Sequence, residues 1–268
     1  FTQYSSTFGN LLADIEFITS VDDKNWVYWI ERAGIKTGRS FAVTLHAAPI
    51  SIARFLAEEL YSRKDSIIFC SATMNVAGST EFISHRIGMD LVEQDRISSF
   101  VAGSAFNFKE QCRVLVPSFL PDPSDKNGEE VFAKAFAECM KRVLVLTNGR
   151  TLILFTSYKL MMLCAEQLEA ELLAQAIPIH VLVQGVGASR ESLTEQFKQK
   201  DRASVLLGTD SFWEGVDLIG DALTNLVIVK LPFDAVNDPI VNARAERVRM
   251  EMGDSFMGYT VPNAVIKF

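Results

Sequence analysis

The second half of the chain alternates short apolar runs with longer amphipathic segments. The runs typical of buried strands are 151–157, 178–184, 203–207 and 225–231. The segments whose apolar residues recur at helical spacing are 159–175, 190–199 and 239–251. Strands that alternate with helices are typical of βαβ units, which build a parallel sheet with helices on both faces. The pattern therefore predicts an α/β fold.

The first half gives fewer signals of this kind. Segment 51–64 has apolar residues at helical spacing and Ser51 in the N-cap position, so it predicts a helix. Residues 66–73, SIIFCSAT, are a short apolar run that stops at small polar residues, as a buried parallel strand would. The stretch 117–130 is rich in Pro, Asp, Ser and Gly, and it is the clearest predicted loop.

The composition is that of an ordinary globular protein. Of the 268 residues, 49% are hydrophobic and 22% are charged, and the formal net charge is −7. This sign is wrong for a protein that holds nucleic acid by bulk charge, so any such role must rest on local groups. No apolar run reaches the roughly 18 residues needed to span a bilayer, and we expect no membrane partner.

The start of the chain and its cysteines narrow the setting. The first residues, FTQYSSTFGN, lack an initiator Met and the layout of a signal peptide, so we expect a piece of a longer chain. The cysteines form no CxxC pair, which favours reduced thiols in a cytosolic protein over a zinc or disulfide framework. They are Cys70, Cys112, Cys139 and Cys164.

Several familiar site motifs are incomplete in this sequence. GIKTGRS at 34–40 lacks the spacing of a phosphate loop, and QGVGASR has Arg190 where a dinucleotide fingerprint needs its third Gly. The three histidines share no metal-ligand spacing, DPSDKNGEE lacks the positions of a calcium loop, and no G-x-S-x-G elbow occurs. What stands is a set of polar clusters that follow predicted strands, at 155–157, at 184–185 and in the stretch 206–220. Ligands of such sheets bind beyond the carboxyl ends of the strands, so the clusters are expected to share one functional edge.

Four short motifs, taken together, resemble a known family. CSATM, ILFTSYKLM, VLVQG and GTDSFWEGVD follow one another in the order and spacing of superfamily 2 helicases of the DinG and XPD type. In that comparison SAT is motif III, LFTSY is motif IV and GTDSFWEGVD is motif V. LHAAPISIA before motif III and KLPF after motif V are also similar. The resemblance covers most of the chain and implies RecA-like helicase lobes.

The resemblance also implies how the chain is divided. Family members carry a phosphate loop and a DEAH-type box upstream and a Q-x-x-G-R-x-x-R motif VI downstream, and the sequence has neither. We therefore expect a remnant of helicase domain 1 with motif III at 1–90. Helicase domain 2, RecA-like with motifs IV and V and truncated before motif VI, is expected at 91–268. No catalytic set is then complete, and the fragment alone is expected to be inactive.

The ligands implied by the resemblance are those of the intact enzyme: ATP, Mg²⁺, single-stranded DNA and the missing N-terminal helicase lobe. The cysteines do not match the family's iron–sulfur cluster, so none is expected in this segment. The motif III residues expected to relay the nucleotide state are Ser71, Ala72 and Thr73. The expected nucleotide-binding residues are Glu214, Gly215 and Asp217. The expected DNA-binding residues are Thr156, Ser157, Gln184, Gly185, Thr209, Ser211 and Trp213.

The chemistry of these side chains fits the implied roles. The Asp217 carboxylate can accept a ribose hydroxyl, and Gly215 allows close backbone approach. The hydroxyls of Thr209 and Ser211 can bind phosphate without adding charge, which suits an acidic protein. Glu214 is expected to brace the loop by accepting backbone N–H groups.

Two alternatives stay open at this point. Phe212 and Trp213 could stack on bases, worth roughly 1–3 kcal/mol per base, or could pack the loop onto the sheet. The resemblance implies an ATP-dependent DNA helicase that moves 5′ to 3′ on single strands in repair or replication, in the cytoplasm, either bacterial cytosol or nucleoid. The rival functions are a non-catalytic lobe that binds single strands or a protein partner, and an unrelated α/β enzyme with its site at the same edge.

Overall fold

The chain forms two compact units. The computed structural model describes residues 2–34, 41–104, 106–125, 127–199, 202–216, 218 and 220–268, with the side chains of all but 2–6, 33, 34 and 41. Unit 1 joins Phe1–Ala102 with Phe233–Lys267, and unit 2 comprises Gly103–Pro232 together with Phe268. The two units are defined by contacts between residues, and their boundaries do not test where one helicase lobe ends and the next begins. The division at residue 90 stays a prediction.

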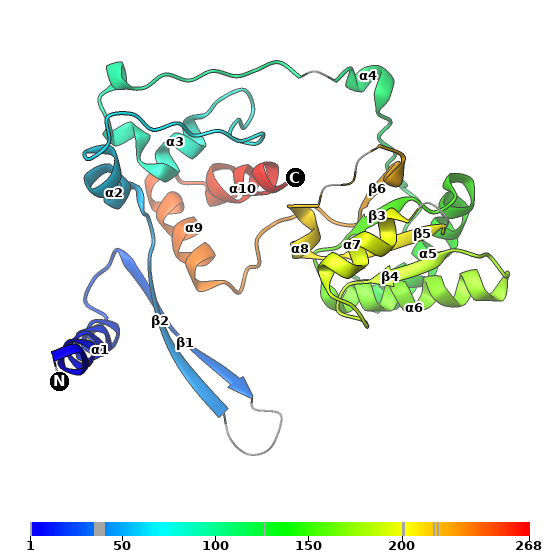
Figure 1. Cartoon of the computed structure of the whole chain (residues 1–268), viewed down its shortest axis with the longest axis horizontal. Coiled ribbons are helices and arrows are strands. Elements are labelled where there is room, and N and C mark those ends of the chain that lie inside the picture. Colours follow the sequence, from blue (N-terminus) through cyan, green and yellow to red (C-terminus); the bar gives the residue numbers. More distant parts are fainter. Residues whose placement is uncertain are drawn as a thin grey trace. The chain divides into compact units, whose positions relative to one another are not determined.

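Unit 2 is built on a parallel sheet of four strands in the order β4-β5-β3-β6 (Figure 1). The strands are β3 (Thr151–Leu154), β4 (His180–Val183), β5 (Ser204–Gly208) and β6 (Asn225–Ile228). In this register Leu152 of β3 lies opposite Leu206 on one side and Leu226 on the other. The predicted α/β fold with a parallel sheet is confirmed, although most strands are a few residues shorter than the apolar runs.

Helices cover both faces of this sheet. They are α5 (Gly128–Thr147), α6 (Tyr158–Ala174), α7 (Arg190–Lys198) and the single turn α8 (Asp210–Trp213), with a short 3₁₀ turn at Gly220–Ala222. Side chains alternate along each strand, so Ile153 and Leu207 pack with α5 and α6, whereas Leu154 and Leu206 pack with α7 and α8. Both faces are therefore buried, which explains why these strands are almost wholly apolar.

Two of the loops that follow strands of the sheet end at the N-cap residue of the next helix. Ser157 caps α6 by accepting from the backbone N–H of Leu160 at 3.3 Å, and Ser189 caps α7 by accepting from that of Ser192 at 3.3 Å. Each cap follows a strand by a few residues. The caps therefore hold the segments after β3 and β4 close to the sheet.

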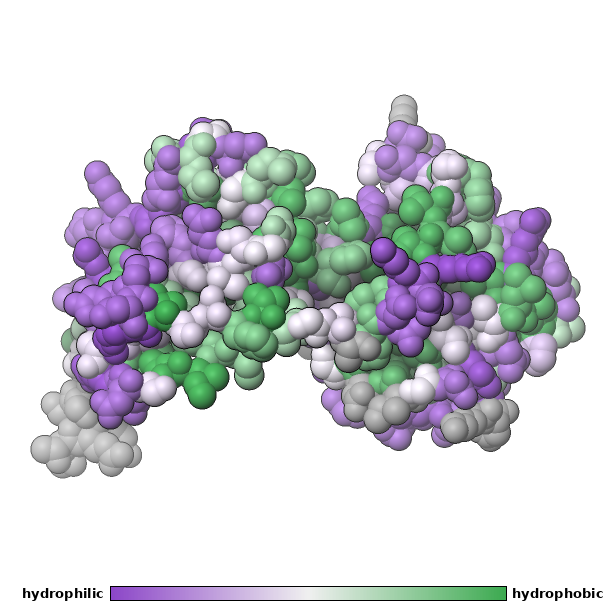
Figure 2. Space-filling model, turned by 90° about the horizontal axis from the view of Figure 1, so that it is seen from above, coloured by the Kyte–Doolittle hydropathy of each residue, from purple (hydrophilic) through white to green (hydrophobic). Residues whose placement is uncertain are grey.

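The loop expected at 117–130 is shorter than predicted. Helix α5 begins at Gly128, and a stripe at every fourth position is buried: Phe132, Phe136, Met140 and Leu144. This stripe has the spacing of an amphipathic helix and packs against α6 in the core. The irregular segment before it exposes the apolar side chains of 114–116. Hydrophobic and hydrophilic residues are interspersed on the molecular face shown in Figure 2.

Unit 1 contains an antiparallel hairpin and several helices. The hairpin is β1 (Trp26–Gly34) with β2 (Phe41–Pro49). The helices are α1 (Thr2–Ser20), α2 (Ala53–Leu56) continuing as a π-helix at Ala57–Tyr61, α3 (Glu81–Ile87), α9 (Pro239–Met252), a π-helix at Phe256–Thr260 and α10 (Val261–Lys267). Short 3₁₀ turns lie at Met89–Leu91 and Gln94–Arg96, and α4 (Phe108–Gln111) belongs to unit 2. Helix α9 is attached to the base of the hairpin, because the Arg244 Nε donates to the Ile50 carbonyl at 2.8 Å.

Two predictions for the first half meet different outcomes. The helix predicted at 51–64 is confirmed over 53–61, and Ser51 accepts from the backbone N–H of Ala53 at 3.2 Å. The strand predicted at 66–73 is wrong, because this stretch is irregular and Ile68 is 88% exposed. Within the described part of unit 1 the hairpin is the only strand ladder, so this run has no parallel neighbour to pair with. In the described residues, no helix is long and apolar enough to cross a membrane.

Candidate nucleic-acid interface

The three polar clusters of unit 2 lie at one edge of the sheet. We call this the carboxyl edge, and it consists of residues 155–157 after β3, 184–185 after β4 and 209–214 after β5. Because β3, β4 and β5 are adjacent and parallel, their carboxyl ends meet at the same edge (Figure 1). The structure therefore brings the predicted motif IV and motif V residues of this unit together.

Gln184 and Thr209 are joined by two hydrogen bonds. The Gln184 Oε1 accepts from the Thr209 backbone N–H at 2.6 Å and from the Thr209 hydroxyl at 3.1 Å. With its oxygen engaged twice, Gln184 has its amide NH₂ left as a donor. The hydroxyl of Thr209 uses its proton in this contact and can only accept from a ligand while the bond lasts. Of this pair, Gln184 is thus the better phosphate donor.

The two aromatic residues of motif V pack against the sheet. Phe212 is buried, and a Cβ at Gly208 would lie 2.6 Å from its ring, so Gly208 leaves the space that the ring fills. Trp213 is half-buried, and its indole N–H donates to the Phe155 carbonyl at 3.1 Å. This geometry favours the packing interpretation for both, and base stacking by Trp213 stays a prediction.

The remaining predicted DNA-binding residues lie on the same edge. Thr156 and Ser211 are exposed, and the Ser157 oxygen caps α6, which leaves its hydroxyl proton free to be donated. Gly185 has φ +80°, and a Cβ there would lie 2.5 Å from the hydroxyl of Tyr158. Sequence reasoning missed Tyr158, whose only signal was its place directly after the motif IV serine.

The predicted nucleotide-binding residues are placed only in part. Glu214 is exposed, and its backbone carbonyl accepts from the Arg190 Nη2 at 2.6 Å. The Glu214 carboxylate was expected to brace the loop. In the described residues, the contact with Arg190 is made by the Glu214 backbone carbonyl instead. Gly215 has φ +68°, a backbone conformation that favours glycine. Asp217 lies outside the described residues. Arg190 was not predicted, because only the fold brings it to the loop.

Motif III lies in unit 1. The Ser71 hydroxyl oxygen accepts from the backbone N–H of Thr73 at 3.2 Å, and the two hydroxyl oxygens are 3.3 Å apart. Ser71, Ala72 and Thr73 are all exposed in an irregular segment. Their role as a relay stays a prediction.

Two titratable groups of unit 2 have pKa values shifted by their surroundings. The pKa of the Glu191 carboxyl is held below its usual range by its own backbone N–H, the Ser189 hydroxyl and the Arg190 guanidinium, so it is ionised at neutral pH. Burial raises the pKa of the Cys164 thiol to about 12, which keeps it protonated and unreactive. Within the part of the chain that is described, no three His, Cys, Asp or Glu residues cluster as metal ligands. The absence of an iron–sulfur cluster from this segment stays a prediction.

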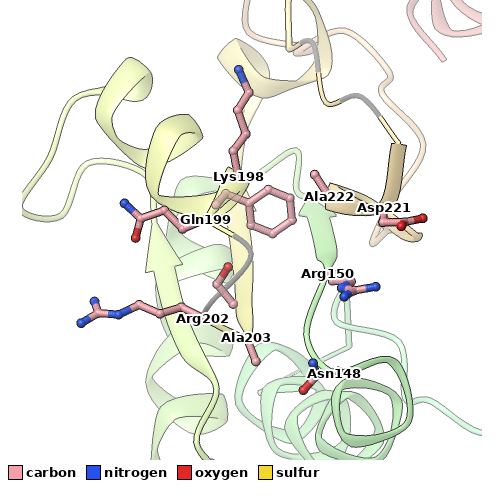
Figure 3. A pocket seen from close by; sticks show the side chains of 10 residues that line it. Asn148, Arg150, Lys198, Gln199, Arg202, Ala203, Asp221 and Ala222 are labelled. Carbon is pink, nitrogen blue, oxygen red and sulfur yellow. The ribbon is translucent and has the colours of Figure 1, made fainter.

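A small pocket lies at the opposite, amino-terminal edge of the sheet. Its lining includes Arg150 before β3, Lys198 at the end of α7, and Gln199 and Arg202 between α7 and β5. Figure 3 shows the side chains of Lys198, Gln199 and Arg202 pointing away from the space between them and Arg150. The charged groups do not converge, so this pocket is not a built anion site.

Comparison with known proteins supports the resemblance to helicases that the sequence motifs indicate. Residues 140–268 match the helicase C-terminal domain family. The ATP-dependent DNA helicase YoaA of Haemophilus influenzae is 35% identical over 90% of this chain and 34% of its own length. The 3′-5′ exonuclease DinG of Bacillus subtilis is 32% identical over 94% of this chain and 26% of its own length. A solved structure of S. tokodaii Xpd4 aligns with 54% of this chain and 27% of its own at 20% identity, with a TM-score of 0.38.

The parallel sheet, covered on both faces and with polar loops at its carboxyl edge, is an α/β fold, as expected for a RecA-like lobe. The family match over 140–268 and identities of 32–35% over 90% or more of the chain support a C-terminal helicase region of the DinG and XPD type. It spans about a third of the length of YoaA and about a quarter of that of DinG. The activity of a whole enzyme is therefore a matter of proposal.

Proposed function

We propose that this chain is part of an ATP-dependent DNA helicase and that its carboxyl edge binds the backbone of single-stranded DNA. Unit 2 lies within the second RecA-like lobe, proposed to span 91–268, and residues 1–90 with motif III come from the first lobe. The proposal is supported by the family match and by the ordered motifs. Single-stranded DNA and the N-terminal part of the first lobe are the partners.

The observation that carries the proposal is the hydrogen-bonded pair Gln184–Thr209. It links the ends of two neighbouring strands and leaves the Gln184 amide as a donor on the same edge as the exposed hydroxyls of Thr156 and Ser211. Neutral donors of this kind bind phosphate oxygens without requiring a basic surface. They account for how a chain with a net charge of −7 could bind a polyanion.

The activity of the whole enzyme is proposed from the names of the relatives and the motif resemblance. ATP and Mg²⁺ would bind with the help of Glu214, Gly215 and Asp217, and motif III would relay the nucleotide state. Hydrolysis would drive 5′-to-3′ movement on a single strand during repair or replication in the cytoplasm. One curated relative is named as a 3′-5′ exonuclease, so the names of the relatives do not agree on one activity.

The direct test is fluorescence anisotropy of a labelled single-stranded oligonucleotide, titrated with the chain over a salt series. We expect weak binding that fades as salt rises and that exceeds binding to a duplex of the same sequence. Gln184→Ala removes the donor and should weaken single-strand binding about three- to tenfold, as the loss of roughly one hydrogen bond would. Thr209→Ala should weaken it less, because the backbone N–H of Thr209 remains.

Gln199→Ala is the matched control. It removes an exposed amide of the same kind at the amino-terminal edge, and binding should not change. Equal losses in both variants, or no binding at low salt by the unsubstituted chain, would contradict the proposal. Absence of single-strand binding would favour the alternative of a lobe that serves a protein partner.

A further inference from the structure

Arg190 reaches from one strand end to the loop after the next strand. It is the first residue of α7, which follows β4, and its Nη2 donates to the Glu214 carbonyl at 2.6 Å. Its guanidinium carbon lies 5.7 Å from the centre of the Phe212 ring, within the range of a cation–π contact. One side chain therefore holds the loop 209–216 at two points.

The neighbouring glycine leaves room for this contact. A Cβ at Gly215 would lie 3.1 Å from the Arg190 Nη2, closer than most Cβ contacts allow. The sequence motif predicts Gly215 as a place of close approach to nucleotide. The structure supplies a second reason for a glycine, because any side chain would press against the guanidinium.

The contact continues from Arg190 to the DNA-binding pair. The Phe212 backbone N–H donates to the Thr209 carbonyl at 2.7 Å, and the Thr209 backbone N–H donates to the Gln184 Oε1 at 2.6 Å. Fixing Phe212 and Glu214 therefore fixes the turn α8, whose first residue follows Thr209. Loosening the loop would loosen the group that orients the Gln184 amide.

The type of residue is informative. A cation in the first turn of a helix faces the positive end of the helix dipole, which is unfavourable by itself. The nearby Glu191 carboxylate offsets part of this cost. A planar guanidinium can lie over a ring while an N–H donates sideways to a carbonyl, and an ammonium group cannot do both in this geometry. The arginine is thus suited to holding the loop.

We propose that Arg190 is a positioning residue that holds the loop 209–216, and through it Gln184, in the arrangement that binds single-stranded DNA. This rests on the proposed function of the carboxyl edge. Arg190 acts through the loop and not by contacting phosphate, because one of its terminal nitrogens is engaged by Glu214 and its plane is near Phe212.

The test compares Arg190→Gln and Arg190→Lys with Arg202→Gln, an equal loss of charge at the exposed amino-terminal edge. The measurement is single-strand affinity over a salt series, with circular dichroism to show that each variant is folded. Arg190→Gln should lower affinity about threefold to tenfold, as loss of about one hydrogen bond would. The slope of log affinity against log salt should match that of Arg202→Gln, because no phosphate contact is lost. Arg190→Lys should not restore affinity.

A second readout does not depend on DNA. Trp213 lies in the loop, and replacing Trp26 and Trp29 by Phe leaves it as the only tryptophan. In this background Arg190→Gln should shift Trp213 emission to longer wavelength, because the loosened indole meets more water, whereas Arg202→Gln should not.

Three outcomes would overturn the inference. The first is unchanged Trp213 emission in Arg190→Gln. The second is a salt slope shallower than that of Arg202→Gln by about 0.7, the change expected for one lost single-strand phosphate contact. The third is full rescue by Arg190→Lys. Failure of the proposed function would look different, because the unsubstituted chain would not bind single strands while the Trp213 shift persisted.

Discussion

At the scale of single residues, hydrogen bonds decide which groups of the carboxyl edge can meet a ligand. The resemblance named Gln184 and Thr209 as separate DNA contacts, but the structure makes them partners, with the amide as the remaining donor of Gln184. Trp213 uses its only donor on the Phe155 carbonyl. These assignments depend on which side chains meet across strands, which no local sequence pattern encodes.

Gly208 gives a residue-scale prediction about stability. A Cβ at this position would lie 2.6–2.7 Å from three atoms of Phe212, which is buried and cannot move aside freely. Gly208→Ala should therefore lower the free energy of unfolding by about 1–3 kcal/mol, the usual cost of overpacking a core. Urea denaturation followed by circular dichroism measures it.

Gly103→Ala is the control for this change. Gly103 belongs to the same unit, its φ is not positive and a Cβ there would meet no atom within 4 Å. Its unfolding free energy should stay within about 0.5 kcal/mol of the unsubstituted chain. If both variants lost stability equally, the close approach of Phe212 to Gly208 would not be the cause.

At the scale of elements, the sequence predicted best where its pattern was regular. All four strands of the sheet and helices α6, α7 and α9 form within a few residues of the predicted bounds. The strands are short apolar runs bounded by polar or turn residues, and the three helices begin at the capping residues Ser157, Ser189 and Asp238. Helix α5 was not predicted, because its first residues belong to the loop-like stretch 117–130, although Phe132, Phe136 and Met140 have helical spacing.

The strand predicted at 66–73 failed for a different reason. An apolar run becomes a buried strand only when neighbouring strands pair with it, and that pairing is a property of tertiary structure. The location of the carboxyl edge was predicted correctly, because the carboxyl ends of adjacent parallel strands lie at the same edge of a sheet. The contacts of Arg190 and Tyr158 were not predicted, because they depend on the path of the loops.

The contact between α5 and α6 gives a prediction about pH. The Lys141 Nζ lies 2.5 Å from the Glu138 Oε2 and 2.9 Å from the Glu171 Oε2, and its side chain is only 9% exposed. Hydrogen bonds to Glu138 and then Glu171 raise the pKa of Lys141, and hydrogen bonds from Lys141 and Arg142 lower that of Glu138. A raised lysine pKa stabilises the fold at pH below the unfolded value of 10.5, and this is lost as pH rises through the higher folded pKa.

The carboxylate has the opposite sign. The lowered pKa of Glu138 stabilises the fold above the unfolded value of 4.5, and this is lost as pH falls through the lower folded pKa. Thermal melts from pH 3 to 11 should show both losses. Lys141→Met keeps the buried stem and removes the charge, so it should reduce both losses. It should also lower the melting temperature near neutral pH, where both contributions are fully present.

The partner variant separates this explanation from a packing effect. Glu171→Gln leaves Lys141 paired with Glu138 alone, so it should lower the melting temperature at neutral pH. The loss of stability at alkaline pH should then begin at a lower pH than in the unsubstituted chain. If Lys141→Met and the unsubstituted chain had the same dependence on pH, the triad would not be its source.

At the scale of the whole molecule, the buried core is unevenly divided. Both large hydrophobic clusters lie in unit 2. Among the described residues of unit 1, the buried apolar side chains are Tyr61, Tyr259, Pro262 and Ala264. The hairpin β1–β2 has two strands, and an isolated two-stranded ladder is marginally stable in water. The two units are therefore expected to differ in stability.

Hydrogen exchange followed by mass spectrometry tests this expectation. Amides of β3 and β5, at the centre of the sheet and between two covered faces, should open only with global unfolding of unit 2. Amides of β1 and β2 should exchange about a hundredfold faster or more, because local opening of the hairpin exposes little buried surface. Sub-denaturing urea should not slow exchange in either set of amides. It should speed exchange more in β3 and β5 than in the hairpin, because only the unfolding of unit 2 exposes a large core, and the difference in exchange rate should therefore shrink. Equal protection of the hairpin and the central strands would mean that unit 1 draws stability from contacts beyond its own small core.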